Sequence, residues 1–341
     1  MPFRMPPPNP MIAVEKEPTD ELNQPTIGIM VLNFNGEKWL PPLYESIRKQ
    51  TYPKLKTYLI DNASSDESVP LTLAGYPEVK VLTFSKNAGY CIAYNSSMPI
   101  AFKDGCDWVI WANSDVLLEP GCIDEMGRIA AEFHQIGVIG PAFVGWDSNE
   151  PNVYMLENQP RVVAAMQQGL TFPIDVDWVE GSLLMVSRHC VEDVGWLDPF
   201  LFFYWEEADF CRRAVLKDWR VVLAPRAVAR HYGGGSTQQR PDSLDAKRQL
   251  KRRNQYVYVL ANPNHTFTRN LVECFYLFLV LLKSAFKIHP NTITFEIRAS
   301  LHLIPELREI WNKWKRDRTG VSPEATTPEY ADIRIEIGGN C

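Results

Sequence analysis

Apolar runs and amphipathic segments alternate along the first third of the chain. Four runs rich in branched and aromatic residues have the length and pattern of buried strands: 26–33, 56–60, 79–84 and 107–112. Apolar residues recur at helical spacing from Leu40 to Ile47, which predicts a helix that ends before Pro53. A further helix is predicted over residues 88–102. Strands that alternate with helices are typical of an α/β fold with a mostly parallel sheet flanked by helices.

The middle of the chain is less regular. Residues 145–175 are rich in Asn, Pro and Gln, which predicts a variable loop region. Beyond them the pattern predicts a strand at 182–187, a helix from Glu206 or Glu207 to about Lys217, and a strand at 220–223.

The two ends of the chain differ from this α/β region. The proline-rich residues 1–25 predict a disordered leader, so the α/β domain should span residues 26–239. Residues 240–320 predict a helical extension, and residues 321–341 a tail. The extension combines apolar, aromatic and basic positions, as interfacial membrane helices do. Packing on the domain or on a dimer partner remains the alternative, and we favour membrane contact.

Composition and charge exclude several classes of protein. The chain has 341 residues and a formal net charge of −6, which argues against a nucleic-acid-binding protein. Its seven cysteines form no CxxC pair, so reduced thiols in a cytoplasmic protein are expected. No apolar signal segment opens the sequence, which also favours the cytoplasm. The phosphate-binding patterns GxGxxG and GxxxxGK[ST] are absent, so dehydrogenases and P-loop enzymes lose support.

Polar residues cluster just after the predicted strands. Since ligands bind beyond the carboxyl ends of parallel strands, these clusters should line one crevice: 33–35, 61–66, 86–95 and 113–115. A carboxylate at such a strand end, as at Asp115, can hold a divalent cation, although a solvated loop aspartate is the plainer interpretation. His231, before a glycine run, could be a metal ligand or an ordinary surface histidine.

Three acids lie within four residues at the start of the helix predicted near 206. Neighbouring carboxylates raise one another's pKa, which suits a general base. Acids at a helix N-terminus are also favoured by the helix dipole alone. The candidates are Glu206, Glu207 and Asp209.

The order of these motifs along residues 26–235 resembles the inverting glycosyltransferase family 2, in particular its bacterial rhamnosyltransferase-like branch. The segments that carry the resemblance are Val31–Asn35, Ile60–Asp66, Lys86–Tyr90 with Asn95, Asn113–Asp115, Glu180–Ser182, Phe203–Arg212 and His231. The resemblance implies a GT-A fold, in which residues 26–116 bind the nucleotide-sugar and residues 117–239 the acceptor. It also implies transfer of a sugar from a nucleotide diphosphate with inversion at the anomeric carbon.

The resemblance assigns roles to individual residues. Asp115 and His231 would hold Mg²⁺ or Mn²⁺, with Asn113 in place of the family's first acid. Glu207, where aspartate is more usual, would be the catalytic base, and Glu206 and Asp209 stay as alternatives. The residues implied to bind the nucleotide-sugar are Asn33, Asn35, Asp61, Asn87, Gly89, Asn95 and Asn113. Those implied on the acceptor side are Gly181, Trp205 and Arg213, where Trp205 could equally be a core residue and Arg213 could pair with Asp209.

The expected partners follow from the resemblance and the C-terminal extension. The donor would be a dTDP- or UDP-sugar, with rhamnose the first expectation. The acceptor would be a saccharide, expected to be lipid-linked, in bacterial surface polysaccharide assembly, reached at the inner face of the cell membrane. A homo-oligomer stays open. The alternatives are a polyprenyl-phosphate glycosyl synthase, a sugar-1-phosphate nucleotidyltransferase and a non-catalytic sugar-nucleotide-binding protein.

Overall fold

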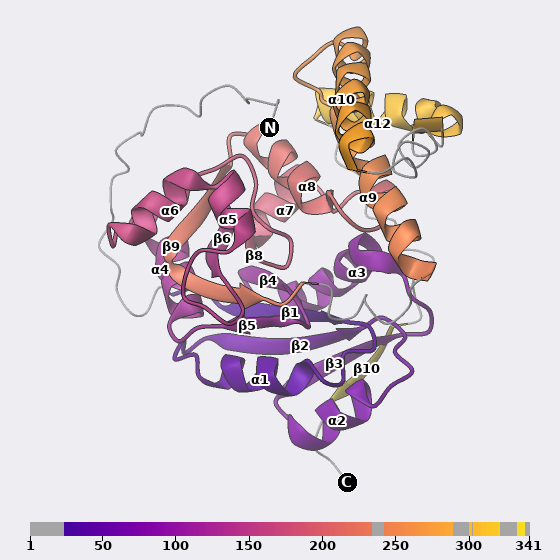
Figure 1. Cartoon of the computed structure of the whole chain (residues 1–341). Coiled ribbons are helices and arrows are strands. Elements are labelled where there is room, and N and C mark those ends of the chain that lie inside the picture. Colours follow the sequence, from indigo (N-terminus) through magenta and orange to yellow (C-terminus); the bar gives the residue numbers. More distant parts are fainter. Residues whose placement is uncertain (1–23, 234–241, 289–299, 302, 321–332, 338–341) are drawn as a thin grey trace.

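The protein is an α/β domain that carries a C-terminal group of helices (Figure 1). The computed structural model describes residues 24–233, 242–288, 300–301, 303–320 and 333–337. The strands are β1 Ile27–Asn33, β2 Leu55–Asp61, β3 Val79–Phe84, β4 Trp108–Asn113, β5 Val116–Leu118, β6 Ile136–Val144, β7 Ile174–Asp175, β8 Leu183–Ser187, β9 Arg220–His231 and β10 Ile333–Ile337. The helices are α1 Leu40–Arg48, α2 Ser68–Gly75, α3 Gly89–Lys103, α4 Cys122–Glu132, α5 Val153–Asn158, α6 Pro160–Gln167, α7 Arg188–Val194, η2 Pro199–Leu201, α8 Glu206–Val215, α9 Asp242–Leu260, α10 Phe267–Ile288, η3 Ile304–Glu306 and α12 Leu307–Thr319.

One sheet runs through the domain in the order β10-β3-β2-β1-β4-β8-β6-β9-β5, with β7 paired to β9. Its first half is parallel, as predicted, because β3, β2, β1 and β4 all run the same way. The register places Asn33 opposite Asp61, and Leu32 opposite Asn113. The polar residues that end these strands therefore meet at one edge of the sheet.

The second half of the sheet is mostly antiparallel and brings distant segments to that same edge. β8 runs antiparallel to β4, and the Asn113 backbone N–H donates to the Ser182 carbonyl at 2.8 Å. β5 pairs with the end of β9, so that Val116 lies opposite His231. Asp115, Ser182 and His231 thus converge although up to 116 residues separate them in sequence, from 115 to 231.

The helices cover both faces of the sheet. α1 and α2 lie on the face opposite to α3, α7 and α8 (Figure 1). α1 starts with Pro41 and Pro42 in its first turn, where a missing N–H costs nothing, and buries its apolar side as the spacing predicted. The central strands are buried on both faces, and β1 and β4 form the middle of the core.

Some expectations from the sequence are corrected. The region 145–175 is not a continuous loop, because it contains α5 and α6. β9 continues to His231, beyond the predicted end at 223. Within the predicted tail, Ile333–Ile337 pair with the outer strand β3. Most of the predicted leader lies outside the described residues.

The predicted C-terminal extension is helical. α9 packs against α10 and α12, and the three form a group that stands out from the sheet domain (Figure 1). We call α9, α10, η3 and α12 the C-terminal lobe.

Candidate active site

The ends of β1 and β2 form a hydrogen-bonded polar cluster. The Asp61 Oδ1 accepts from the Asn33 Nδ2 at 2.9 Å, and its Oδ2 accepts from the Ser64 N–H at 3.0 Å. Asn35, in the left-handed region at φ 53°, accepts at its Oδ1 from the Ser65 N–H at 2.8 Å. Three of the predicted nucleotide-binding residues therefore lie together and are held in place by the loop that follows β2.

Asn62 holds the loop before α3 in place, although the sequence predicted no separate role for this residue within the polar cluster 61–66. The Asn62 Oδ1 accepts from the Ala88 N–H at 2.7 Å, and its Nδ2 donates to the Asn87 Oδ1 at 3.0 Å. Gly89 has φ +76°, and a Cβ there would lie 2.4 Å from the Phe202 ring. The need for glycine in this structure thus comes from the ring as well as from the backbone angle.

Asn95 has a structural role, which corrects its predicted place among the ligand-binding residues. Its Nδ2 donates to the Leu197 carbonyl at 2.8 Å, and its Oδ1 accepts from the Leu197 N–H at 3.0 Å. Both polar atoms of the buried amide are thereby used to join α3 to the segment before η2.

Asp115 and His231 face one another across the β5–β9 pair. The His231 Nε2 lies 3.5 Å from the Asp115 Oδ1, and its Nδ1 lies 2.7 Å from the Glu180 Oε1. Burial lowers the pKa of His231, but its hydrogen bonds to Asp115 and Glu180 outweigh this and raise it to about 9. In the absence of a metal ion the ring therefore holds a proton near pH 7, and a divalent cation that binds the Nε2 would replace that proton.

This arrangement fits a divalent cation. Carboxylate oxygen and imidazole nitrogen are suitable ligands for Mn²⁺, and carboxylates also suit Mg²⁺. Glu180 holds the Nδ1 side of the ring, as carboxylates commonly do for metal-binding histidines, and so leaves the Nε2 for the metal. In the part of the chain that the structure describes, no group of three or more His, Cys, Asp or Glu could hold a metal. Further ligands would have to come from the substrate.

The acidic pair at the start of α8 has two different environments. Glu206 is 3% exposed, and burial together with the charge of Glu207 raises its pKa well above the ordinary value. Glu207 is partly buried, and burial first and the charge of Glu180 second raise its pKa to about 7. Burial therefore favours the neutral form of Glu206, while Glu207 can take up or release a proton near pH 7.

Gly181 connects the acidic pair to the cation-binding pair. A Cβ on Gly181 would lie only 3.1 Å from the Glu207 Cδ, so Glu207 packs directly against this glycine. The preceding residue, Glu180, contacts His231. One dipeptide thus touches both halves of the site, a link that the motif order alone could not establish.

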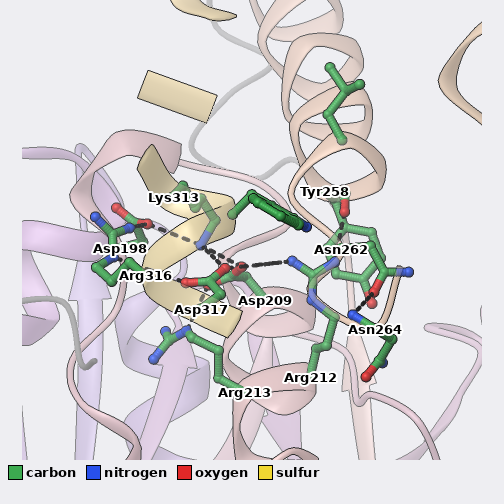
Figure 2. Close-up of polar contacts among 12 residues, drawn as sticks. Asp198, Asp209, Arg212, Arg213, Tyr258, Asn262, Asn264, Lys313, Arg316 and Asp317 are labelled. Carbon is green, nitrogen blue, oxygen red and sulfur yellow. Dashed lines mark hydrogen bonds and ion pairs between the residues drawn. The ribbon is translucent and has the colours of Figure 1, made fainter. Parts of the chain in front are cut away.

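Asp209 and Arg213 belong to a buried ion-pair cluster (Figure 2). The Asp209 carboxylate is 3.0 Å from the Arg213 Nε and 2.8 Å from the Lys313 Nζ of α12. Arg213 also donates to the Val194 carbonyl at 3.1 Å. Asp209 as an alternative base and Arg213 as an acceptor ligand are corrected accordingly, because their charged groups are occupied inside the protein.

Trp205 precedes α8 with φ +72° and is half-buried. Its ring lies 5.2 Å from the Tyr258 ring, centroid to centroid, so one part of it packs on α9. Its predicted contact with a sugar stays a prediction.

A sheet with a parallel part, an antiparallel part and acidic side chains at their common edge is the arrangement of the GT-A fold, and solved glycosyltransferases share it. A mannosyltransferase from Pyrobaculum calidifontis, in complex with GDP-Man and Mn2+, is similar with a TM-score of 0.54 and 14% identity, over 92% of this chain and 89% of that one. S. aureus TarS 1-349, in complex with UDP-GlcNAc, is similar with a TM-score of 0.54 and 16% identity, over 87% of this chain and 90% of that one.

The family is shown by sequence. The profile described as "Glycosyltransferase like family 2" matches residues 25–257, and the chain belongs to this glycosyltransferase family. An N-acetylglucosaminyl-diphospho-decaprenol L-rhamnosyltransferase from Mycobacterium tuberculosis is 27% identical over 244 residues, which are 63% of this chain and 78% of that protein. The GT-A fold, the transferase class and the resemblance to family 2 and its rhamnosyltransferase branch are thereby confirmed.

Proposed function

We propose that this glycosyltransferase moves a sugar, with inversion, from a dTDP- or UDP-sugar to a lipid-linked saccharide, and that the sugar is rhamnose. The name of the M. tuberculosis relative, an L-rhamnosyltransferase that acts on a decaprenol-linked N-acetylglucosamine, supports this choice of donor sugar and acceptor. The predicted place in bacterial surface polysaccharide assembly belongs to the same proposal.

The observation that carries the proposal is the position of the dipeptide Glu180–Gly181. Glu180 contacts His231 at 2.7 Å, and Gly181 packs against Glu207. A diphosphate held near Asp115 and His231 would therefore lie beside the carboxylate of Glu207, and the anomeric carbon of the donor would lie between them.

Glu207 acts as the base in this scheme. Its carboxylate takes the proton of the acceptor hydroxyl while that oxygen attacks the anomeric carbon, and the bond to the nucleotide diphosphate breaks. A single displacement of this kind inverts the anomeric centre. Glu206, kept neutral by burial, stays next to Glu207 without adding a second negative charge.

Asp115 and His231 would hold Mn²⁺ or Mg²⁺. Such an ion neutralises charge on a leaving diphosphate. The chain's own contribution is to fix the two ligands: β5 and β9 pair directly beside them, and Glu180 orients the imidazole ring. The polar cluster of Asn33, Asn35 and Asp61 would receive the nucleoside.

The C-terminal lobe supports a lipid-linked acceptor. One side of α10 exposes large apolar side chains at positions one, three and four residues apart: Leu271, Val272, Phe275, Tyr276 and Leu279. η3 and its neighbours add Leu301, Ile304 and Leu307. We call the five exposed residues of α10 the lobe's apolar face, and we propose that it binds the membrane surface that carries the acceptor. Among the described residues, no helix is both long and apolar enough to cross a bilayer.

Paired variants of the acidic dipeptide test this function. Glu207→Gln should reduce transfer by roughly 10² to 10⁴-fold, since it removes the base, while donor binding persists. Glu206→Gln imitates the neutral form already present and should reduce transfer by less than about tenfold. The assay follows transfer from dTDP-rhamnose to an N-acetylglucosaminyl-diphospho-lipid. Full activity of Glu207→Gln would reject Glu207 as the base, and donor binding without any product from the unaltered protein would favour a non-catalytic binding protein.

A further inference from the structure

The segment that leads into α8 has an unusual backbone. Three residues other than glycine have positive φ angles: Phe202 at 59°, Tyr204 at 74° and Trp205 at 72°. A residue of this kind is strained and persists only where the surroundings hold it. This segment ends at Glu206 and Glu207, so whatever holds it also sets the position of the acidic pair.

The hydrogen bonds of the segment run to other elements and chiefly to α9. The Asn254 Nδ2 lies 2.7 Å from the Leu201 carbonyl oxygen and 2.9 Å from those of Phe203 and Tyr204, so that its two protons serve three acceptors. The Phe200 carbonyl accepts from the Arg253 Nη1 at 2.8 Å. Two neighbouring residues of α9 thus bind four carbonyls of this segment.

The Phe202 carbonyl faces the predicted donor side of the site, and the Trp205 carbonyl accepts from the Asp209 N–H within α8. The Phe202 carbonyl accepts from the Tyr90 N–H at 3.0 Å, at the start of α3, where the Phe202 ring also lies against Gly89. The loop is therefore fastened between the C-terminal lobe and the predicted nucleotide-sugar side. A movement of α9 would therefore displace the loop 200–205 and, through it, the contact with the start of α3.

Lys313 of α12 fastens the two ends of the same segment (Figure 2). Its Nζ is 3.0 Å from the Asp198 Oδ2, just before η2, and 2.8 Å from the Asp209 Oδ1, within α8. The side chain is 1% exposed and is paired also with Asp317 of its own helix at 2.9 Å. The ends of the segment are held by ion pairs from α12, and its middle by an amide from α9.

We propose that Asn254 is a positioning residue for the transfer reaction: it holds the strained loop 200–205 so that Glu207 points at the acceptor hydroxyl. Asn254 is fully buried and acts through the loop, without contact to the reacting atoms. Lys313 supports the same geometry from the ends. The inference rests on the proposed role of Glu207 and deepens it by assigning part of the catalytic geometry to the C-terminal lobe.

The size of the expected effect follows from geometry. Reaction rates are sensitive to displacement of a catalytic group, and a shift of about 1 Å can cost roughly a hundredfold. Without Asn254, the Phe203 and Tyr204 carbonyls lose the amide donor, and the Leu201 carbonyl keeps only the Phe203 N–H, so the positive φ angles lose much of what holds them. The loop should relax, and Glu207, directly after it, should move with α8.

Asn270 offers a matched control within the same lobe. It is also fully buried, and its Nδ2 donates at 2.8 Å to two backbone carbonyls, those of Leu260 and Asn262. These carbonyls belong to the end of α9 and the turn after it, and not to the loop before α8. Asn254→Leu and Asn270→Leu therefore remove the same chemical group from the same kind of environment.

The test compares kcat, the donor KM and the melting temperature of the two variants, with dTDP-rhamnose and an N-acetylglucosaminyl-diphospho-lipid as substrates. We expect both to lose stability, but only Asn254→Leu to lose kcat, by roughly ten- to a hundredfold, with the donor KM changed by less than about threefold. Equal kcat losses in the two variants, or unchanged kcat in Asn254→Leu, would overturn the proposal.

Two further variants keep the result interpretable. If Asn254→Leu does not fold, Arg253→Met takes its place, since it leaves the Asn254 Nδ2 in position and withdraws the hydrogen bonds of Arg253 to the Phe200 carbonyl, the Asn254 Oδ1 and Glu306. It should lower kcat while the protein stays folded, and unchanged kcat would count against the proposal. Glu207→Gln in the same assay separates the two claims: an active Glu207→Gln rejects the base itself, whereas an inactive Glu207→Gln beside a fully active Asn254→Leu rejects only the positioning role.

Discussion

At the scale of single residues, two adjacent glutamates have different acid strengths. Glu206 faces the interior, and burial and a neighbouring charge raise the pKa of its carboxyl, which favours the neutral form. Glu207 packs on Gly181, and its pKa rises only to about 7. A base is most effective when its pKa lies near the working pH, so the fold itself selects Glu207 from the pair.

The pH dependence of the reaction should report this carboxyl. Glu207 must be deprotonated to accept a proton, so kcat/KM should rise with pH up to about 7 and level off above it. The measurement is a pH profile of kcat/KM, with melting temperatures over the same range to show that the protein stays folded. If kcat/KM instead rises with an apparent pKa near 4.5, the ordinary value for glutamate, a different group controls the rate.

What the sequence could predict at this scale depends on where a residue's partners lie. Asp115, His231 and Glu207 stand in motifs whose order indicates their chemistry, and the structure links them through Glu180 and Gly181. The resemblance to family 2 implied that Asn95 binds the nucleotide-sugar, although it lies in the middle of α3. Its partner Leu197 is 102 positions away, and no local pattern reveals such a pair.

At the scale of elements, α12 stabilises α8 from outside the α/β domain. Burial raises the pKa of Asp209, but the charges of Lys313, Arg213 and Arg212 outweigh it and hold the pKa well below its ordinary range. The carboxylate is thus charged throughout the physiological range. The helix that carries the acidic pair depends on a cation from near the end of the chain.

Removal of that cation should destabilise the protein. Lys313→Met leaves the buried carboxylates of Asp198, Asp209 and Asp317 with less positive charge, and we expect a loss of about 3 to 5 kcal/mol in the free energy of unfolding. Lys315→Met, on the exposed side of the same helix, is the control and should cost less than about 0.5 kcal/mol. Denaturant unfolding measures both. Equal effects would mean that the cluster does not hold α12 in place.

Elements whose apolar residues recur at a regular spacing could be predicted from the sequence, whereas elements that form because of tertiary packing could not. The buried strands β1 and β4 and the amphipathic α1 follow directly from their apolar patterns. The short helices α5 and α6 lie in a stretch rich in Asn, Pro and Gln, and they form because Met155, Val162 and Ala165 pack into the core. Lys313 resembles any surface lysine in its sequence, since only the folded chain surrounds it with three carboxylates.

At the scale of the whole molecule, the C-terminal lobe joins two tasks. α9 and α12 hold the loop 200–205 and the start of α8 through Asn254 and Lys313, while α10 carries the exposed side chains of the lobe's apolar face. A lipid-linked acceptor that approaches along a membrane would thus meet the acceptor side of the site with the lobe already oriented.

Membrane binding by the apolar face can be measured directly. Val272→Asp combined with Phe275→Asp places charges on side chains that are 65% and 61% exposed, and should abolish co-sedimentation with vesicles of anionic and neutral phospholipids. Val153→Asp, on α5, changes a side chain that is 67% exposed and should leave sedimentation unchanged. If the unaltered protein does not co-sediment with vesicles but forms a dimer, and the double variant is monomeric, the lobe's apolar face is an interface between two copies of the chain.

The central claim is that Asp115 and His231 bind one cation next to Glu207. A crystal structure with Mn²⁺ and a nucleotide diphosphate, with anomalous diffraction at the manganese edge, tests it most directly. We expect one anomalous peak in contact with the Asp115 carboxylate and the His231 Nε2, with diphosphate oxygens completing its coordination and Glu207 across the sugar pocket. A manganese peak away from these two residues, or a nucleotide bound elsewhere on the sheet, would contradict the account.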